Sequence, residues 1–95
     1  MPGIEQTPAN IDEPRVFTMP PWLVLLHNDD VNDMVHVVQA LVKSVPKLSS
    51  QQATEIMMEA HQNGQALVIT CPLELAELYQ ERLQTPGLTA TIEKA

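Results

Sequence analysis

A short apolar run directly after Pro21 is the feature that most restricts how this chain can fold. Residues 22–27 read Trp-Leu-Val-Leu-Leu-His, and the polar triplet Asn28-Asp29-Asp30 follows at once. The run is too short for a helix and ends in turn-forming residues, so it predicts a buried β-strand.

Two later segments have the character of strands as well. Residues 66–70 are apolar almost throughout, which is typical of a buried strand. Residues 88–93 alternate apolar and polar side chains and predict a half-exposed strand. We expect the three strands to share one sheet.

The first predicted helix covers residues 34–45, with Asn32 or Asp33 as its expected cap. It ends before Pro46, whose ring disfavours a helical residue in front of it. Its apolar side chains recur at helical spacing and would form one face. They are Met34, Val37, Val38, Leu41 and Val45.

The second predicted helix begins after Ser49, which forms a capping box with Gln52, and stops at Asn63-Gly64. A third helix follows, capped by Thr70 or Cys71, with Pro72 in its first turn. Its inner face is expected to consist of Leu75, Leu78, Tyr79 and Leu83.

The resulting order, β-α-α-β-α-β, predicts an α+β fold of two layers. A three-stranded antiparallel sheet packs against three helices. Residues 21–95 would form this domain. Residues 1–20 contain regularly spaced prolines without apolar periodicity and predict a flexible N-terminal tail.

Composition limits the function classes that fit the chain. With 12 acidic residues against 5 basic ones, its net charge of −7 argues against nucleic-acid binding and suits a positively charged partner. The single cysteine, Cys71, excludes an intrachain disulfide and a thiolate zinc site. No segment has the roughly 18 consecutive apolar residues of a membrane span.

The polar triplet after the first strand is the leading candidate for a binding site, because loops at strand ends can aim polar groups. Its structural explanation is an Asx turn followed by a helix cap. His61 shares one side of the second helix with Met57, where it could bind a ligand or simply suit the helix end. Met at helical spacing is equally compatible with a core and with an adaptable binding surface.

Metal binding and acid–base catalysis are weaker alternatives. The available ligands are His27, His36 and His61 with Asp29, Asp30 and Asp33. Their spacing matches neither a His-Glu-x-x-His site nor a calcium loop, and no nucleophile motif accompanies them. We therefore expect no metal, no cofactor and no enzymatic activity.

Taken together, these residues resemble the ClpS family, the bacterial and plastid adaptors of the N-end rule. The family pattern Leu-x-Asn-Asp-Asp, with Met four positions on, is present at residues 26–34. A second family block, Ala-Thr-x-x-Met-x-x-x-His followed by Gly, is present at residues 53–64. Further matches at Ala76-Glu77 and at residues 92–95 extend the resemblance over residues 22–95.

The resemblance implies an adaptor that binds proteins whose first residue is bulky and apolar, through their free α-amino group. The amino group and ligand backbone would be bound by Asn28, Asp29, Asp30, Asn32 and His61. The first side chain would enter a cavity formed by Met34, Val37, Met57, Ala60 and Leu88. Where the family usually has an aromatic residue and then Thr-Pro, this chain has residues 31–33, and Asn32 is expected to hydrogen-bond the ligand backbone.

The resemblance also implies a partner. Such adaptors deliver their substrates to a Clp ATPase, of the ClpA or ClpC type, in the bacterial cytoplasm or the plastid stroma. The expected ATPase contacts are Glu74, Tyr79 and the tail of residues 1–20. We expect a monomer that binds neither nucleic acid nor a membrane. A generic protein-docking domain without the N-terminal pocket is the alternative.

Overall fold

Antiparallel pairing around one central strand organises the computed structural model, which describes residues 19–95. The strands are β1 (Pro21–His27), β2 (Gln65–Pro72) and β3 (Thr89–Lys94). Their order in the sheet is β2-β1-β3, so the first strand lies in the middle. The three predicted strands and their antiparallel arrangement are confirmed, with ends that differ by one or two residues.

The register of the sheet decides which loops become neighbours. His27, the last residue of β1, lies opposite Gln65 of β2 on one side and Thr89 of β3 on the other. Segments that lead into β2 and β3 therefore flank the segment that leaves β1.

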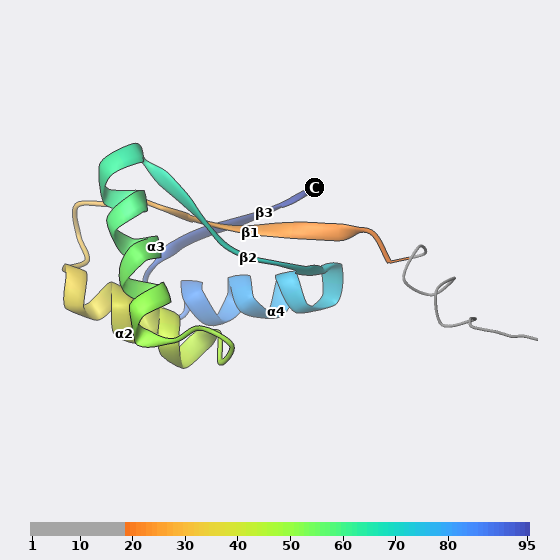
Figure 1. Ribbon diagram of the computed structural model, residues 1–95, viewed down its shortest axis with the longest axis horizontal. Coiled ribbons are helices and arrows are strands. Elements are labelled where there is room, and N and C mark those ends of the chain that lie inside the picture. The colour runs from red at the N-terminus through yellow and green to blue at the C-terminus, as the bar shows by residue number, and fades with distance from the viewer. Residues whose placement is uncertain (1–18) are drawn as a thin grey trace, which may run out of the picture.

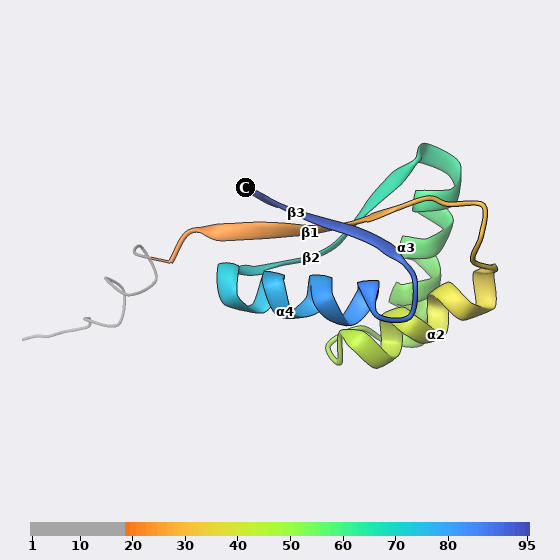
Figure 2. The same ribbon diagram turned by 180° about the vertical axis from the view of Figure 1, so that it is seen from behind.

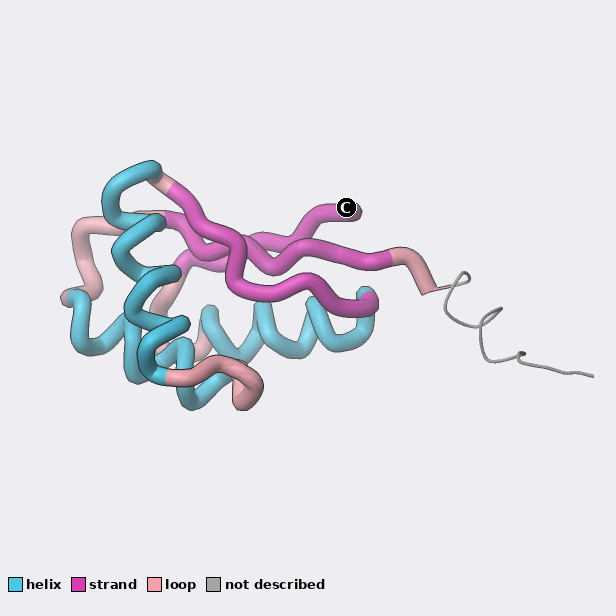
Figure 3. Tube along the Cα trace, in the orientation of Figure 1, coloured by secondary structure: helices cyan, strands magenta, loops and turns pink. Residues whose placement is uncertain are grey.

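Three helices complete the α+β fold: α2 (Met34–Ser44), α3 (Ser50–Asn63) and α4 (Leu73–Gln84). Helix α4 runs beneath the strands beside α2, and α3 stands across the end of the sheet where β2 begins (Figures 1 and 2). The tube trace in Figure 3 shows the same arrangement. Helices α3 and α4 pack against the strands, whereas α2 packs on α3 and α4.

Helix boundaries follow the predicted capping chemistry in two cases. Asp33 caps α2 by accepting a hydrogen bond from the backbone of His36 at 2.8 Å. Ser49 and Gln52 form the predicted capping box of α3, and Gly64 ends that helix in the left-handed region at a φ of 91°.

Helix α4 differs from its prediction at both its cap and its face. Strand β2 continues through Pro72, which is the N-cap and offers no side-chain hydrogen bond, so the expected cap by Thr70 or Cys71 is wrong. Ala76 is fully buried, whereas Leu75 and Leu78 are 39% and 38% exposed. A small residue lets the helix lie close to the sheet, and this rotates the buried stripe away from the two leucines.

The core between sheet and helices is mainly aliphatic, with Tyr79 as the aromatic residue buried within it. Its most completely buried large side chains are Leu41, Leu83, Val24 and Val45. Of the predicted tail, residues 1–18 lie outside the described part of the chain, and Met19 and Pro20 precede β1 as exposed residues. No helix within residues 19–95 is long and apolar enough to cross a lipid bilayer.

The core assignment predicts that Leu83→Ala lowers the free energy of unfolding by about 2–5 kcal/mol, because it leaves a cavity under a fully buried side chain. Leu78→Ala on the same helix is the matched control, with an expected loss below about 1.5 kcal/mol. Urea denaturation followed by circular dichroism measures both values. Equal losses would contradict the orientation of α4.

Candidate functional site

The loop of residues 28–33 is held between two other segments of the chain. The Asn28 backbone N–H donates to the Gly64 carbonyl at 2.9 Å, which ties the end of β1 to the end of α3. On the other side, the Asn32 side-chain amide donates to the Gly87 carbonyl at 2.9 Å. The loop is therefore fixed against the start of β2 and the start of β3.

A pocket of about 350 Å³ opens beneath this loop. Every residue predicted for the α-amino site and for the apolar cavity lines it. Three residues that the sequence reasoning left out line it as well, namely Leu26, His27 and Asp33. Their positions in the sequence could have identified them. Leu26 and His27 end the buried strand just before Asn28, and Asp33 caps the helix that carries Met34.

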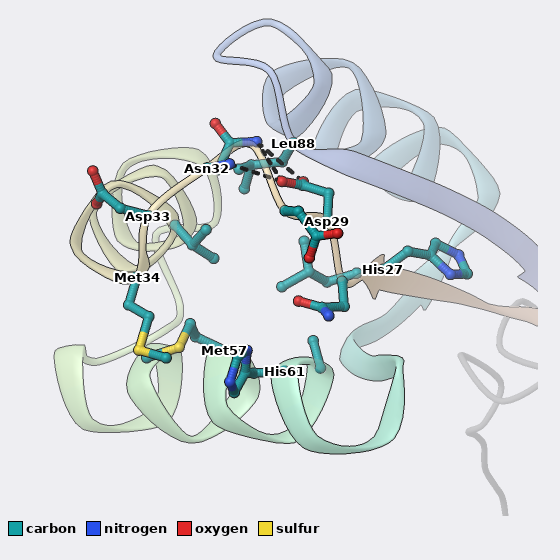
Figure 4. Close-up of a pocket in the computed structure, with 13 residues that line it drawn as sticks. His27, Asp29, Asn32, Asp33, Met34, Met57, His61 and Leu88 are labelled. Carbon is teal, nitrogen blue, oxygen red and sulfur yellow. Dashed lines mark hydrogen bonds between the residues drawn. The ribbon is translucent and has the colours of Figure 1, made fainter.

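The floor of the pocket is apolar. Met57, Ala60 and Leu88 are buried there, and Val37 is half-buried. Met34 is 44% exposed and stands where the pocket meets solvent. Figure 4 shows the side chains of Met34 and Met57 side by side on one wall. Unbranched thioether side chains can adapt their shape to different apolar ligands.

The opposite wall carries oxygen acceptors, with Asp29 at their centre. Its Oδ1 accepts hydrogen bonds from the backbone N–H groups of Val31 at 3.0 Å and Asn32 at 2.8 Å. Oδ2 accepts only from the Asn32 side chain, at 3.1 Å. The Asn32 backbone hydrogen bond is the main cause that holds the pKa of Asp29 below its ordinary value, and burial opposes it. The carboxylate is therefore ionised at neutral pH.

These hydrogen bonds are the Asx turn and the helix cap that were the structural explanation of the triplet, and the charged Asp29 still lines the pocket. Asp29 forms the Asx turn by accepting from the Val31 N–H, and Asp33 forms the cap, as local sequence chemistry predicts. The amide nitrogen of Asn32 is occupied by the Asp29 carboxylate and the Gly87 carbonyl. Asn32 therefore orients Asp29 and the loop.

His61 lies across the pocket from Asp29. It is an exposed residue in the last turn of α3, one turn after Met57. In Figure 4 it stands on the α3 side of the opening, with Asp29 on the facing side. A neutral imidazole offers one hydrogen-bond acceptor, so the rim presents acceptors from two directions.

The turn after α4 closes the third side of the pocket. Gly87 has a φ of 100°, which favours glycine. The His36 ring donates through Nε2 to the Pro86 carbonyl at 2.9 Å. Together with Asn32, this hydrogen bond fixes the turn to the start of α2, and Leu88 projects into the pocket directly after it.

Two of the three histidines considered as metal ligands have separate hydrogen-bond partners. His27 pairs with the Thr91 hydroxyl at 2.7 Å, and His36 pairs with Pro86. In Figure 4 His27 points away from His61. Among residues 19–95, no group of three or more His, Cys, Asp or Glu side chains is arranged to hold a metal ion.

Two of the three predicted ATPase contacts lie on α4, away from this pocket, and residues 1–18 of the third lie outside the described residues. Glu74 is exposed in the first turn of α4. Tyr79 is only 6% exposed and belongs to the core. The prediction that Tyr79 is a surface contact is therefore wrong, because its side chain is buried in the core.

The sequence of this chain is similar to those of known proteins. The family model described as ATP-dependent Clp protease adaptor protein ClpS matches residues 18–91. The Clp protease adapter protein ClpS of Synechococcus elongatus is 55% identical over 74 residues, which cover 78% of this chain and 78% of the relative. The chloroplastic adapter protein CLPS1 of Chlamydomonas reinhardtii is 44% identical over 92 residues, covering 97% of this chain and 57% of the relative.

A solved structure is similar as well. Agrobacterium tumefaciens ClpS2 bound to L-phenylalaninamide superposes with a TM-score of 0.75 at 27% sequence identity. The match covers 80% of this chain and 98% of the Agrobacterium chain.

The hydrogen bonds of Asn32 lead to a prediction about Asp29. In Asn32→Ala the pKa of Asp29 should rise toward its ordinary value, because a side-chain hydrogen bond that lowers it is lost. A lowered folded-state pKa contributes stability above the unfolded pKa, and this contribution is lost as pH falls through the folded pKa. The variant should thus lose about 0.5–1.5 kcal/mol at neutral pH and less in acid.

NMR titration of the Asp29 carboxyl carbon measures this shift. Asn63→Ala, an exposed asparagine outside the loop, is the control and should leave the pKa of Asp29 unchanged. An unchanged value in Asn32→Ala would show that Asn32 does not orient the carboxylate.

Proposed function

The chain belongs to the ClpS family of Clp protease adaptors, and we propose that its pocket binds the first residue of proteins with a bulky apolar N-terminus and a free α-amino group. As an adaptor, the chain binds such a protein, an N-degron substrate, and delivers it to a Clp ATPase for degradation. It acts on the selection of substrates and is not itself the protease.

One observation carries this proposal: acceptors on two sides of a rim stand above an apolar floor. An α-amino group is largely cationic at neutral pH, since its pKa is about 7.7–8.0, and it offers three donors. Asp29 supplies a negative charge, and Asn28, Asp30 and His61 supply further acceptors around the same opening. Well-placed charge-assisted hydrogen bonds contribute about 1.5–3 kcal/mol each.

The apolar floor accounts for the choice of side chain. Burying a leucine or phenylalanine side chain between Met57, Ala60 and Leu88 contributes about 1.5–3 kcal/mol. Met34 narrows the mouth near the ligand's Cβ, so branched Val and Ile should fit worse than Leu. L-phenylalaninamide, present in the Agrobacterium structure, combines a free amino group with an apolar side chain. Its chemistry is that expected of a ligand here.

Asn32 has a positioning role in this proposal rather than a direct contact with the ligand. Its amide nitrogen already bonds Asp29 and Gly87. It holds the Asp29 carboxylate at the rim and ties loop 28–33 to the turn that carries Leu88.

The ATPase partner meets a different surface in this account. Glu74 lies in the first turn of α4, close in sequence to the exposed residues Leu73 and Leu75. An acidic residue amid exposed leucines suits a mixed apolar and charged contact. We further propose that the partner is a ClpA- or ClpC-like ATPase and that the adaptor is a monomer. Its proposed location is the bacterial cytoplasm or the plastid stroma. The cyanobacterial and chloroplastic relatives support that location.

Peptide binding tests the function directly. Fluorescent peptides that start with free Leu or Phe should bind, whereas the same peptides with an acetylated start should bind at least about tenfold more weakly, because the charge is lost. Affinity for the free peptides should fall as pH rises through about 8, where the ammonium loses its proton. Fluorescence anisotropy measures both effects.

The acetylated series also provides the decisive contrast. Equal affinity for free and acetylated peptides would rule out recognition of the ammonium group and would return the chain to a generic docking domain.

Substituting the facing histidine tests the geometry of the rim. His61→Ala should raise the Kd for a free Leu peptide by about tenfold, because one acceptor is removed from the ammonium site. Gln62→Ala, an exposed neighbour that does not line the pocket, should change the Kd less than about twofold. Isothermal titration calorimetry gives the affinities, and thermal melts check that both variants fold. Equal affinities in the two variants would remove His61 from the site.

A further inference from the structure

A second groove lies on a different face of α2, between that helix and the carboxyl end of α4. Its volume is about 540 Å³, larger than that of the first pocket. Both ribbon views show the end of α4 beside α2 at this place (Figures 1 and 2). We call it the α2–α4 groove; its polar lining consists of His36, Gln39, Lys43, Ser44, Arg82 and Thr85.

The charge of this groove is opposite to that of the molecule. The chain carries 12 acidic and 5 basic residues, yet the lining contains Lys43 and Arg82 and no Asp or Glu. Each of the two cations stands in the last turn of its helix, where it suits the partial negative charge of the helix end. This interaction with the helix dipole explains why each helix has a cation in its last turn. It does not explain why Lys43 and Arg82 line the same cavity.

The packing of the two helix ends brings these cations together. The Ser44 hydroxyl donates to the Arg82 backbone carbonyl at 3.2 Å, which joins the ends of α2 and α4 and does not involve the guanidinium group. Lys43 and Arg82 are both exposed, so their charged groups are accessible to a ligand in the groove.

The groove and the first pocket share a wall. His36 lines the groove and hydrogen-bonds Pro86, while Asn32 lines the pocket and hydrogen-bonds Gly87. Pro86 faces the groove and Leu88 the pocket. Because the two cavities share this wall, the groove is the neighbouring cavity for a polypeptide whose first residue fills the pocket, and an extended chain advances by about 3.3–3.6 Å per residue.

We propose that the α2–α4 groove binds an acidic stretch of the substrate polypeptide a few residues downstream of its N-terminal residue. Carboxylates of this stretch accept hydrogen bonds from the Lys43 ammonium, the Arg82 guanidinium and the Gln39 amide. The inference rests on the proposed function, because the first residue of the same polypeptide occupies the pocket. The positively charged start of such a polypeptide complements the pocket that carries Asp29, and the acidic residues that follow complement the groove that carries Lys43 and Arg82.

Because the whole chain is acidic, its net charge and the groove have opposite expected effects on the binding of an acidic peptide. A protein with a net charge of −7 should repel acidic peptides at low ionic strength. The groove predicts the reverse for an acidic stretch placed correctly.

The test compares fluorescent peptides that start with free Leu and differ only at their fifth to seventh residues. Three glutamates at these positions should give about three- to tenfold tighter binding than three glutamines in low salt. High salt should reduce this preference, because the pairs are exposed. Anisotropy titrations on the full chain measure it.

Two double variants locate the effect. Lys43→Gln with Arg82→Gln should abolish the preference for the glutamate peptide while leaving the affinity for the glutamine peptide unchanged. Lys47→Gln with Lys94→Gln removes the same charge from exposed positions outside the groove and should retain the preference. Thermal melts of both variants separate binding from stability.

The outcomes distinguish this inference from the proposed function. If the glutamine peptide binds and the glutamate peptide binds equally or more weakly, the groove does not recognise acidic residues, and the N-terminal pocket stands. If the variant with Lys43→Gln and Arg82→Gln melts at a lower temperature but still prefers the glutamate peptide, the two cations only stabilise their helix ends and do not bind the ligand. If neither peptide binds, both the proposed function and this inference fail.

Discussion

The pairing of β1 with strands on both sides is the constraint on which the binding site depends. Because His27 lies opposite Gln65 and Thr89, the chain that leaves β1 must pass between the segments that enter β2 and β3. Those segments are the end of α3, which carries His61, and the turn that carries Leu88. The Asn28 to Gly64 hydrogen bond fixes the first of these junctions. A pocket with a polar rim and an apolar floor follows from this topology.

Asp29 connects the stability of the loop with its chemistry. The backbone and side-chain groups of residues 31 and 32 bind its carboxylate and keep it ionised. The same hydrogen bonds shape the turn, so the charge is oriented before a ligand arrives, which lowers the cost of ordering the site on binding. The structural and the binding explanations of this residue are therefore compatible.

Much of the fold could be predicted from local sequence chemistry. Asp33, one of the two expected caps, begins α2, the Ser49–Gln52 box begins α3 and Gly64 ends it, because capping depends on neighbouring residues. The face of α4 could not be predicted in this way. Tyr79 and Leu83 are buried as predicted, but helical periodicity accepts either Leu75 and Leu78 or Ala76 beside them, and the packing of α4 on the sheet buries Ala76. The strand order is likewise a long-range property, so the meeting of Asn28 with His61 was expected from family resemblance rather than from periodicity.

The central claim is that the ammonium of a chain start is held between the end of β1 and the end of α3. The most direct measurement follows backbone and side-chain NMR signals while L-leucinamide, and separately its N-acetylated form, is added. The account predicts saturable shifts at Asn28, Asp29 and His61 and in the Met57 methyl group with L-leucinamide, and none of comparable size with the acetylated compound. Shifts confined to other surfaces, or equal shifts with both compounds, would contradict it.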